Sequence, residues 1–280
     1  MLLKQKTNQD TSYQPMQETA LGLFFSSNDP QKPQSRLNLQ FSSSLREDSL
    51  FIKQLDNAPQ IKDDLTSANI FFPEGESSQQ DTVSWPVDLA HSESFEHFCK
   101  GQQNKRDPEL QQAILLKLCH MLHLIHYHEL VNYPITGEMI RISDQGEPMM
   151  MLLPVTNLDG MSTGAKEILF NPQYSAPETM ESLSMNPGTF SYNLGMLAAL
   201  MSSFMMDTGN QEAQDQPREA VYQQLLFWLQ KPEDQKEIRQ IKDLIMQSLQ
   251  QDPSARPFCP MQIYKALGGT ACVDCRELGS

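Results

Sequence analysis

The hydrophobic pattern of this chain changes near its middle, and this change limits the possible folds more than any other feature. Short runs of strand character dominate the first half, and polar segments rich in turn residues separate them. The second half instead places apolar residues at helical spacing, most clearly over residues 110–128. Strands followed by helices predict an α+β protein with a sheet in its first part. The predicted strands of the first half are residues 20–26, 36–41, 49–55 and 68–72.

The second half contains further helical patterns and one strand pair. Residues 139–143 and 149–153 read as two short strands joined by a turn at residues 144–146. Proline and small polar residues interrupt the pattern at residues 85–94, which predicts a boundary between two lobes there. The further predicted helices are residues 191–206, 222–229 and 237–249.

Composition excludes several classes of function. The 280 residues include 35 acidic and 21 basic side chains, a formal charge of −14, which disfavours binding to nucleic acid or to anionic lipid. No segment has the length and apolarity of a membrane span, so none is expected. An odd number of scattered cysteines fits a reducing compartment, and we expect a cytoplasmic protein. The five cysteines are Cys99, Cys119, Cys259, Cys272 and Cys275.

Two motifs in the second half resemble the large lobe of eukaryotic-type protein kinases. Ala176, Pro177 and Glu178 match the Ala-Pro-Glu motif that closes the activation segment. Residues 252–257, Asp-Pro-Ser-Ala-Arg-Pro, match the late arginine element of that family. The resemblance implies that Arg256 is the buried ion-pair partner of Glu178.

A third motif lies between these two, at the spacing that the family shows. Residues 192–196 resemble the start of the central buried helix, with Asn193 and Gly195 at the matching positions. The resemblance implies a two-lobed kinase-like fold, with a small β-rich N-lobe and a larger α-helical C-lobe. The predicted parts are a flexible leader at 1–16, the N-lobe at 17–88, the C-lobe at 89–270 and a tail at 271–280.

The catalytic motifs of the family are not present at the matching positions. Phosphoryl transfer depends on a lysine at the phosphates, an aspartate base, and an aspartate and an asparagine that hold magnesium. The catalytic base position is a proline, and apolar residues replace both metal ligands. The degenerate positions are Asn132, Tyr133, Pro134, Met139, Leu152, Leu153 and Pro154.

Lys53 is the candidate for the phosphate lysine, because residues 51–55 resemble the strand that carries it in the family. The alternative is an ordinary exposed strand lysine. The turn at residues 27–35, expected to be glycine-rich, contains no glycine, so its backbone amides could not approach phosphates closely. Nucleotide binding is therefore not expected, and neither is a cofactor.

Two further patterns bear on the site. Four histidines, at 120, 123, 126 and 128, have spacings that could share a metal ion, but successive steps rotate around the helix and no other ligand set completes the site, so no metal is predicted. Methionines 149–151 lie on the strand that would face the nucleotide cleft. Such flexible apolar side chains suggest a cleft filled by the protein itself.

These observations predict a pseudokinase without phosphoryl-transfer activity. It would bind another protein, such as an active kinase or another signalling enzyme, as a scaffold or an allosteric regulator. One alternative is a secreted bacterial effector that uses a kinase-like fold to engage host proteins. A second alternative is a divergent nucleotide-dependent transferase.

Overall fold

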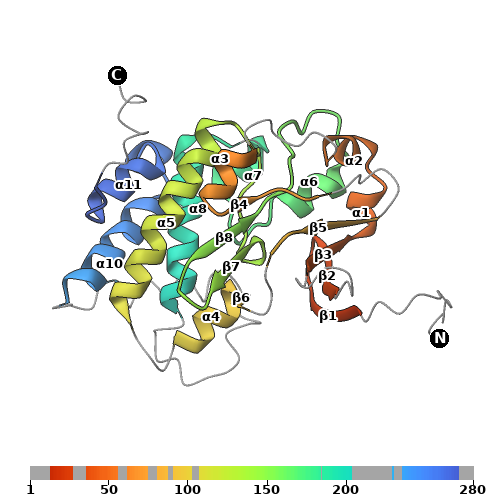
Figure 1. Cartoon of the computed structure of the whole chain (residues 1–280). Coiled ribbons are helices and arrows are strands. Elements are labelled where there is room, and N and C mark those ends of the chain that lie inside the picture. The colour runs from red at the N-terminus through yellow and green to blue at the C-terminus, as the bar shows by residue number, and fades with distance from the viewer. Residues whose placement is uncertain are drawn as a thin grey trace.

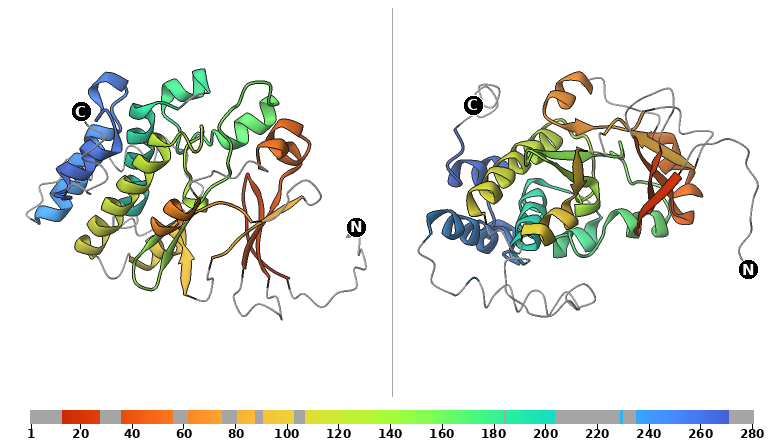
Figure 2. Two further views of the ribbon diagram at one scale, coloured as in Figure 1. Left: turned by 45° about the horizontal axis from the view of Figure 1, so that its top comes forward. Right: turned by 60° about the horizontal axis from the view of Figure 1, so that its bottom comes forward.

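The computed structural model shows a mixed α+β protein with two four-stranded sheets and a group of helices (Figure 1). The first sheet, sheet A, lies at one end of the molecule, the main helices lie at the other, and the second sheet, sheet B, lies between them (Figures 1 and 2). The structure describes residues 13–27, 36–55, 62–74, 81–87, 91–102, 107–183, 185–203, 229 and 235–270.

Sheet A is antiparallel throughout, in the strand order β1-β2-β3-β5. Its inward face is apolar because the side chains alternate: Leu37, Leu39 and Phe41 of β3 are buried together with Val83 and Trp85 of β5. The strands are β1 (Tyr13–Glu18), β2 (Gly22–Ser27), β3 (Arg36–Phe41) and β5 (Thr82–Trp85).

Sheet B has the order β4-β8-β7-β6 and joins distant parts of the chain. The strands β7 and β8 form an antiparallel hairpin, and β4 runs parallel to β8. The turn between β7 and β8 contains Gly146 at a φ of +76°, a conformation that glycine adopts without steric cost. The strands are β4 (Ile70–Phe71), β6 (Ser92–Ser94), β7 (Ile140–Ser143) and β8 (Pro148–Met151).

The helical part is built around α5 (Pro108–Tyr127) and α8 (Pro187–Ser203). Helix α5 begins at a side-chain cap, where Asp107 accepts a hydrogen bond from the backbone N–H of Leu110. Helices α10 (Lys236–Ser248) and α11 (Pro260–Ala266) pack against these two. The shorter helices are α1 (Ser43–Arg46), α2 (Ser49–Leu55), α3 (Lys62–Ser67), α4 (Phe95–Gln102), η2 (Gly137–Met139), α6 (Thr163–Leu169), α7 (Pro177–Ser182) and η4 (Pro253–Ala255).

The strand predicted at residues 49–55 is wrong, since these residues form helix α2. Two local features explain the difference. Asp48 accepts hydrogen bonds from the backbone N–H groups of Leu50 and Phe51, as a helix N-cap does. Phe51 and Leu55, four residues apart, are both buried and define one helical face.

The flexible leader predicted at residues 1–16 needs correction at its end, because β1 begins at Tyr13. Pairing with β2 gives this polar segment its backbone hydrogen bonds, which its composition did not reveal. Sequence reasoning also missed β5, a short strand just before the predicted boundary. The helix predicted at residues 222–229 lies outside the described residues except for Leu229.

Within the described part of the chain, no helix is long and apolar enough to cross a membrane.

Candidate functional site

The candidate site is the inter-sheet pocket, the space between the inward face of sheet A and sheet B. Between the described side chains no part of it is wide enough for a water molecule. Pockets that bind small molecules or cofactors, in contrast, typically measure roughly 300–1,000 Å³. Every lining side chain is apolar: Leu21, Phe24, Leu39, Trp85, Met139, Met151 and Leu153.

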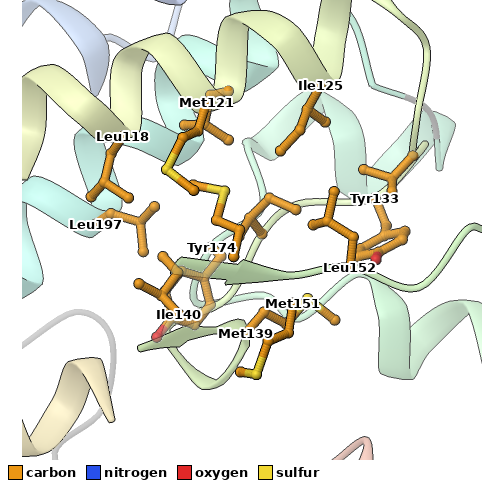
Figure 3. Close-up of a cluster of buried hydrophobic side chains, with 14 of the residues drawn as sticks. Leu118, Met121, Ile125, Tyr133, Met139, Ile140, Met151, Leu152, Tyr174 and Leu197 are labelled. Atoms are coloured by element: carbon orange, nitrogen blue, oxygen red, sulfur yellow. The ribbon is translucent and has the colours of Figure 1, made fainter. Parts of the chain in front are cut away.

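The side of the pocket formed by sheet B lies opposite the core of the helical part (Figure 3). Leu118, Met121 and Ile125 point from α5 toward one side of the β7–β8 hairpin, while Met139 and Met151 lie on its other side. Both methionines are buried. The hairpin is therefore covered by apolar side chains on both faces.

The turn between β1 and β2 inserts Leu21 into the pocket. Thr19 and Gly22 exchange backbone hydrogen bonds across this turn, and the carbonyl of Leu21 accepts a hydrogen bond from the N–H of Ser42. Gly22 has a φ of +145°, and a Cβ there would lie 1.9 Å from the carbonyl oxygen of Gln40. Only glycine fits at this position, and this close approach sets where Leu21 enters the pocket.

Leu21, Phe24, Leu39 and Trp85 were not among the site residues predicted from the sequence. Leu39 lies in the strand predicted at residues 36–41, but a strand pattern does not reveal which surface the strand meets. Trp85 also donates a hydrogen bond from Nε1 to the carbonyl of Leu152, at 3.4 Å. This bond joins sheet A directly to the segment after β8.

Tyr133 and Asn132 hold backbone segments together. The Tyr133 hydroxyl donates to the carbonyl of Leu153 and accepts from the N–H of the same residue, at 2.9 and 2.8 Å. Complete burial raises the pKa of this hydroxyl, although the hydrogen bond to Leu153 opposes the shift. Asn132 accepts a hydrogen bond from the N–H of Met185. Both side chains are therefore engaged in structural hydrogen bonds.

The other positions that the resemblance aligns with catalytic motifs are buried. Pro134, Met139, Leu152, Leu153 and Pro154 are all inaccessible to solvent or nearly so. None of these side chains carries a charge or can ligate a metal ion through oxygen. The segment that the resemblance aligns with a catalytic loop is therefore part of the core.

Asn193 of α8 forms a two-pronged contact with this segment. Its Oδ1 accepts from the N–H of Ile135 at 3.0 Å, and its Nδ2 donates to the carbonyl of Ile135 at 2.8 Å. Two residues later, Gly195 allows close packing of α8 against α10, because a Cβ there would lie 2.6 Å from the Cβ of Ser248. Asn193 therefore fixes the backbone at Ile135 against α8, and Gly195 lets α8 pack closely against α10.

Glu178 and Arg256 lie together, as the resemblance implies. The two groups form a bidentate ion pair with N–O distances of 2.6 and 3.0 Å. Arg256 also donates to the carbonyls of Gln250 and Gln251, and its guanidinium lies 4.8 Å from the ring centre of Tyr192. Ala176 and Pro177 occupy the N-cap and first position of α7, which places Glu178 in its first turn.

Lys53 was expected on a strand, but this prediction is wrong. The residue lies on helix α2, where its side chain is exposed. It is not among the residues that line the inter-sheet pocket. Lys53 lies away from the pocket because residues 49–55 form a helix and not the predicted strand. An extended chain would have pointed residue 53 to one face of the sheet, whereas the helix buries Phe51 and Leu55 and turns Lys53 toward solvent.

Glu138 is partly buried and directly precedes Met139, which lines the inter-sheet pocket. Burial raises the pKa of its carboxyl group; the nearby Glu96 adds to this effect, and a hydrogen bond from Thr19 opposes it. Glu96 itself forms an ion pair with Lys100 and accepts a hydrogen bond from Gln17. Across the described ranges, no group of three or more His, Cys, Asp or Glu side chains could hold a metal ion.

Comparisons with known proteins add no family to this description. No model of a known protein family matches the chain, and no curated protein matches it either.

Proposed function

We propose that this protein is a pseudokinase, a kinase-like protein that does not transfer phosphate and acts by binding another protein. In this proposal, sheet A with α1 and α2 forms the small lobe, and sheet B with the other helices forms the large lobe. The small lobe predicted at residues 17–88 is thereby reduced, because α3 and β4, which lie within that range, pack with sheet B, where β4 pairs with β8. The order of elements supports it: antiparallel strands, a long helix, a β-hairpin, and then the three motifs around Glu178, Asn193 and Arg256.

The observation that carries the proposal is the apolar filling of the inter-sheet pocket. In a kinase-like arrangement the nucleotide would bind between the two sheets, and its phosphates would require cations and magnesium ligands. Seven apolar side chains occupy that space instead, and no water molecule fits between them. Nucleotide binding would require the displacement of several buried side chains, each of which stabilises the fold by roughly 1.5–3 kcal/mol.

The lost catalytic positions support the same proposal. A retained enzyme would be expected to keep polar groups at the positions of Pro134, Met139 and Leu152, and these side chains are buried among the core. Lys53, the candidate for the phosphate lysine, is exposed on α2 and does not line the pocket. A divergent transferase would also need to bind a nucleotide. A measurement of nucleotide binding therefore tests the pseudokinase proposal and the transferase alternative together.

The partner proposed here is a protein, and the acidic composition favours one with a basic face. The role would be that of a scaffold or an allosteric regulator of a signalling enzyme. A cytoplasmic location remains the prediction from the cysteine content.

The proposal is tested by the thermal unfolding of the purified protein with ATP or ADP at millimolar concentration, with and without magnesium. A ligand at roughly 100 times its Kd would stabilise the native state by about 2.7 kcal/mol, which for a chain of this size raises the Tm by roughly 5–10 °C. We expect no shift beyond that produced by inorganic tripolyphosphate at the same ionic strength. A magnesium-dependent shift specific to the nucleotide would contradict the proposal.

A further inference from the structure

Side chains from a distant helix region satisfy backbone groups of the segment between β8 and α6. Residues 152–162 belong to no helix or strand, although all of them lie in the described part of the chain. Backbone N–H groups outside regular structure need other partners, or water, to satisfy them. In residues 156–162, the partners from outside the segment are the side chains of Asp48 and Gln54.

Gln54 of α2 contacts this segment with both ends of its amide. Its Oε1 accepts from the N–H groups of Thr156 and Asn157, at 3.0 and 2.8 Å. Its Nε2 donates to the carbonyl of Asn157 at 2.6 Å and lies 3.7 Å from the sulfur of Met161. A single side chain therefore satisfies three backbone groups of two consecutive residues.

Asp48 makes the second connection at the other end of the segment. One carboxylate oxygen accepts from Leu50 and Phe51 and so caps α2, while the other accepts from the N–H of Ser162 at 2.6 Å. Burial raises the pKa of this carboxyl group, but the hydrogen bonds from Phe51, Ser162 and Leu50 outweigh it, so the pKa lies below its ordinary value. The carboxylate is thus shared between α2 and the segment.

Packing reinforces these polar contacts. A Cβ on Gly160, which has a φ of +80°, would lie 2.9 Å from Cδ1 of Leu50 on α2. A Cβ on Gly164, just after the segment, would lie 3.4 Å from the Ser44 hydroxyl of α1. Figure 1 shows α6 beside α1 and α2. Small residues thus let this part of the chain approach both helices closely.

We propose that Asp48 and Gln54 form a two-point latch that holds residues 156–162 against α2. The latch makes α2 and the segment move as one unit, and it has to open before the segment can change conformation. This inference goes beyond the proposed function, since it requires neither a kinase-like fold nor an empty nucleotide site.

Amide hydrogen exchange over residues 152–163, measured by mass spectrometry with overlapping peptides, tests the latch. In Gln54→Ala we expect the amides of Thr156 and Asn157 to exchange about tenfold faster, the factor that corresponds to one or two lost hydrogen bonds. In Asp48→Asn the amide of Ser162 should show the same change. Gln145→Ala, the same substitution at an exposed turn position, should leave all three amides unchanged.

Gln54→Glu gives a sharper variant in case Gln54→Ala does not fold. Its carboxylate keeps the two acceptor contacts but cannot donate to the carbonyl of Asn157, so exchange should rise by less than in Gln54→Ala. Three results would overturn the latch: wild-type amides of Thr156 and Asn157 that exchange as in an unstructured peptide, no change in the variants, or an equal increase across the whole chain. A nucleotide-dependent Tm shift would contradict the pseudokinase proposal and leave the latch intact.

Discussion

The inter-sheet pocket and the Glu178–Arg256 region hold the molecule together by different kinds of interaction. The pocket consists of apolar side chains whose contacts have no fixed direction. Around Arg256, four directional hydrogen bonds and an aromatic ring meet one guanidinium that is completely buried. The first region should tolerate changes that conserve volume, whereas the second should tolerate almost none.

This difference also separates the positions that resemble a kinase motif from the aligned positions that do not. Glu178, Asn193 and Arg256 each bind groups far away in the sequence, and no other side chain type reproduces their geometry. Met139, Leu152 and Leu153 contribute only volume and apolar surface. Under the pseudokinase proposal, polar residues with structural roles have been kept, while polar residues with chemical roles have been replaced by core residues.

The largest effect is expected for Arg256→Met, which keeps much of the side-chain volume but removes all four donors. It leaves Glu178 without its partner and two carbonyls without donors, and breaking such a pair costs about 3–5 kcal/mol. The free energy of unfolding, measured with urea, should fall by about 4 kcal/mol. Glu178→Gln, which retains an acceptor for Arg256, should lose clearly less. An Arg256→Met protein as stable as the wild type would remove the contrast between the two regions.

Asn193→Leu comes next in size, because it preserves volume but leaves the N–H and C=O of Ile135 buried without partners. Each such group costs about 1–3 kcal/mol, so we expect a loss of about 3 kcal/mol in urea unfolding. The neighbouring variant Leu194→Met is a matched control in the same buried helix and should lose under about 1.5 kcal/mol. Equal losses in the two variants would show that Asn193 acts only by filling space.

The sequence predicted much of the helical part, and the reason is local. Residues 110–128 carry a helical period strong enough to place α5 within a few residues, and the strands at 36–41 and 139–143 were recognised by their strand-like residues between turn segments. The mixed α+β class followed from the order of these patterns. In contrast, the helix at Ser49–Leu55 was misread because its seven residues are too few to separate the two periods.

The candidate site was less accessible to prediction. The methionines of β8 suggested an apolar filling, but the residues contributed by sheet A depend on how two sheets face each other. Leu21 enters the pocket through a turn set by Gly22, and β1, which precedes that turn, has too polar a sequence to be recognised as a strand. Three of the contacts of Gln54 are to backbone groups, which carry no sequence pattern at all.

Asp48→Asn should show a smaller effect that depends on pH. The lowered pKa of Asp48 means that its carboxylate stabilises the folded state above the ordinary aspartate pKa of about 3.9, and that this stability is lost as the pH falls through the folded-state pKa. We expect the variant to be about 2 kcal/mol less stable at pH 7, from the loss of charge-assisted hydrogen bonds. Urea unfolding at pH 7 and pH 3 should show the difference shrinking at the lower pH; a constant difference would contradict the assigned role.

Met151→Leu is expected to have the smallest effect. The substitution nearly conserves volume in the inter-sheet pocket, where Met151 makes only apolar contacts, so the loss should stay below about 1.5 kcal/mol. Met151→Lys, which places a charge among the same side chains, should be far more destabilising. If thermal unfolding showed both variants to be well tolerated, the pocket would be open to water and not filled.

The fluorescence of Trp85 tests directly whether the inter-sheet pocket is closed and apolar. A Trp228→Phe variant leaves Trp85 as the single tryptophan, because the chain has two, and Trp85 is 1% exposed and lines the pocket. We expect blue-shifted emission that acrylamide quenches weakly and that magnesium–ATP does not alter. Strong quenching, or a saturable change in emission with magnesium–ATP, would contradict this expectation.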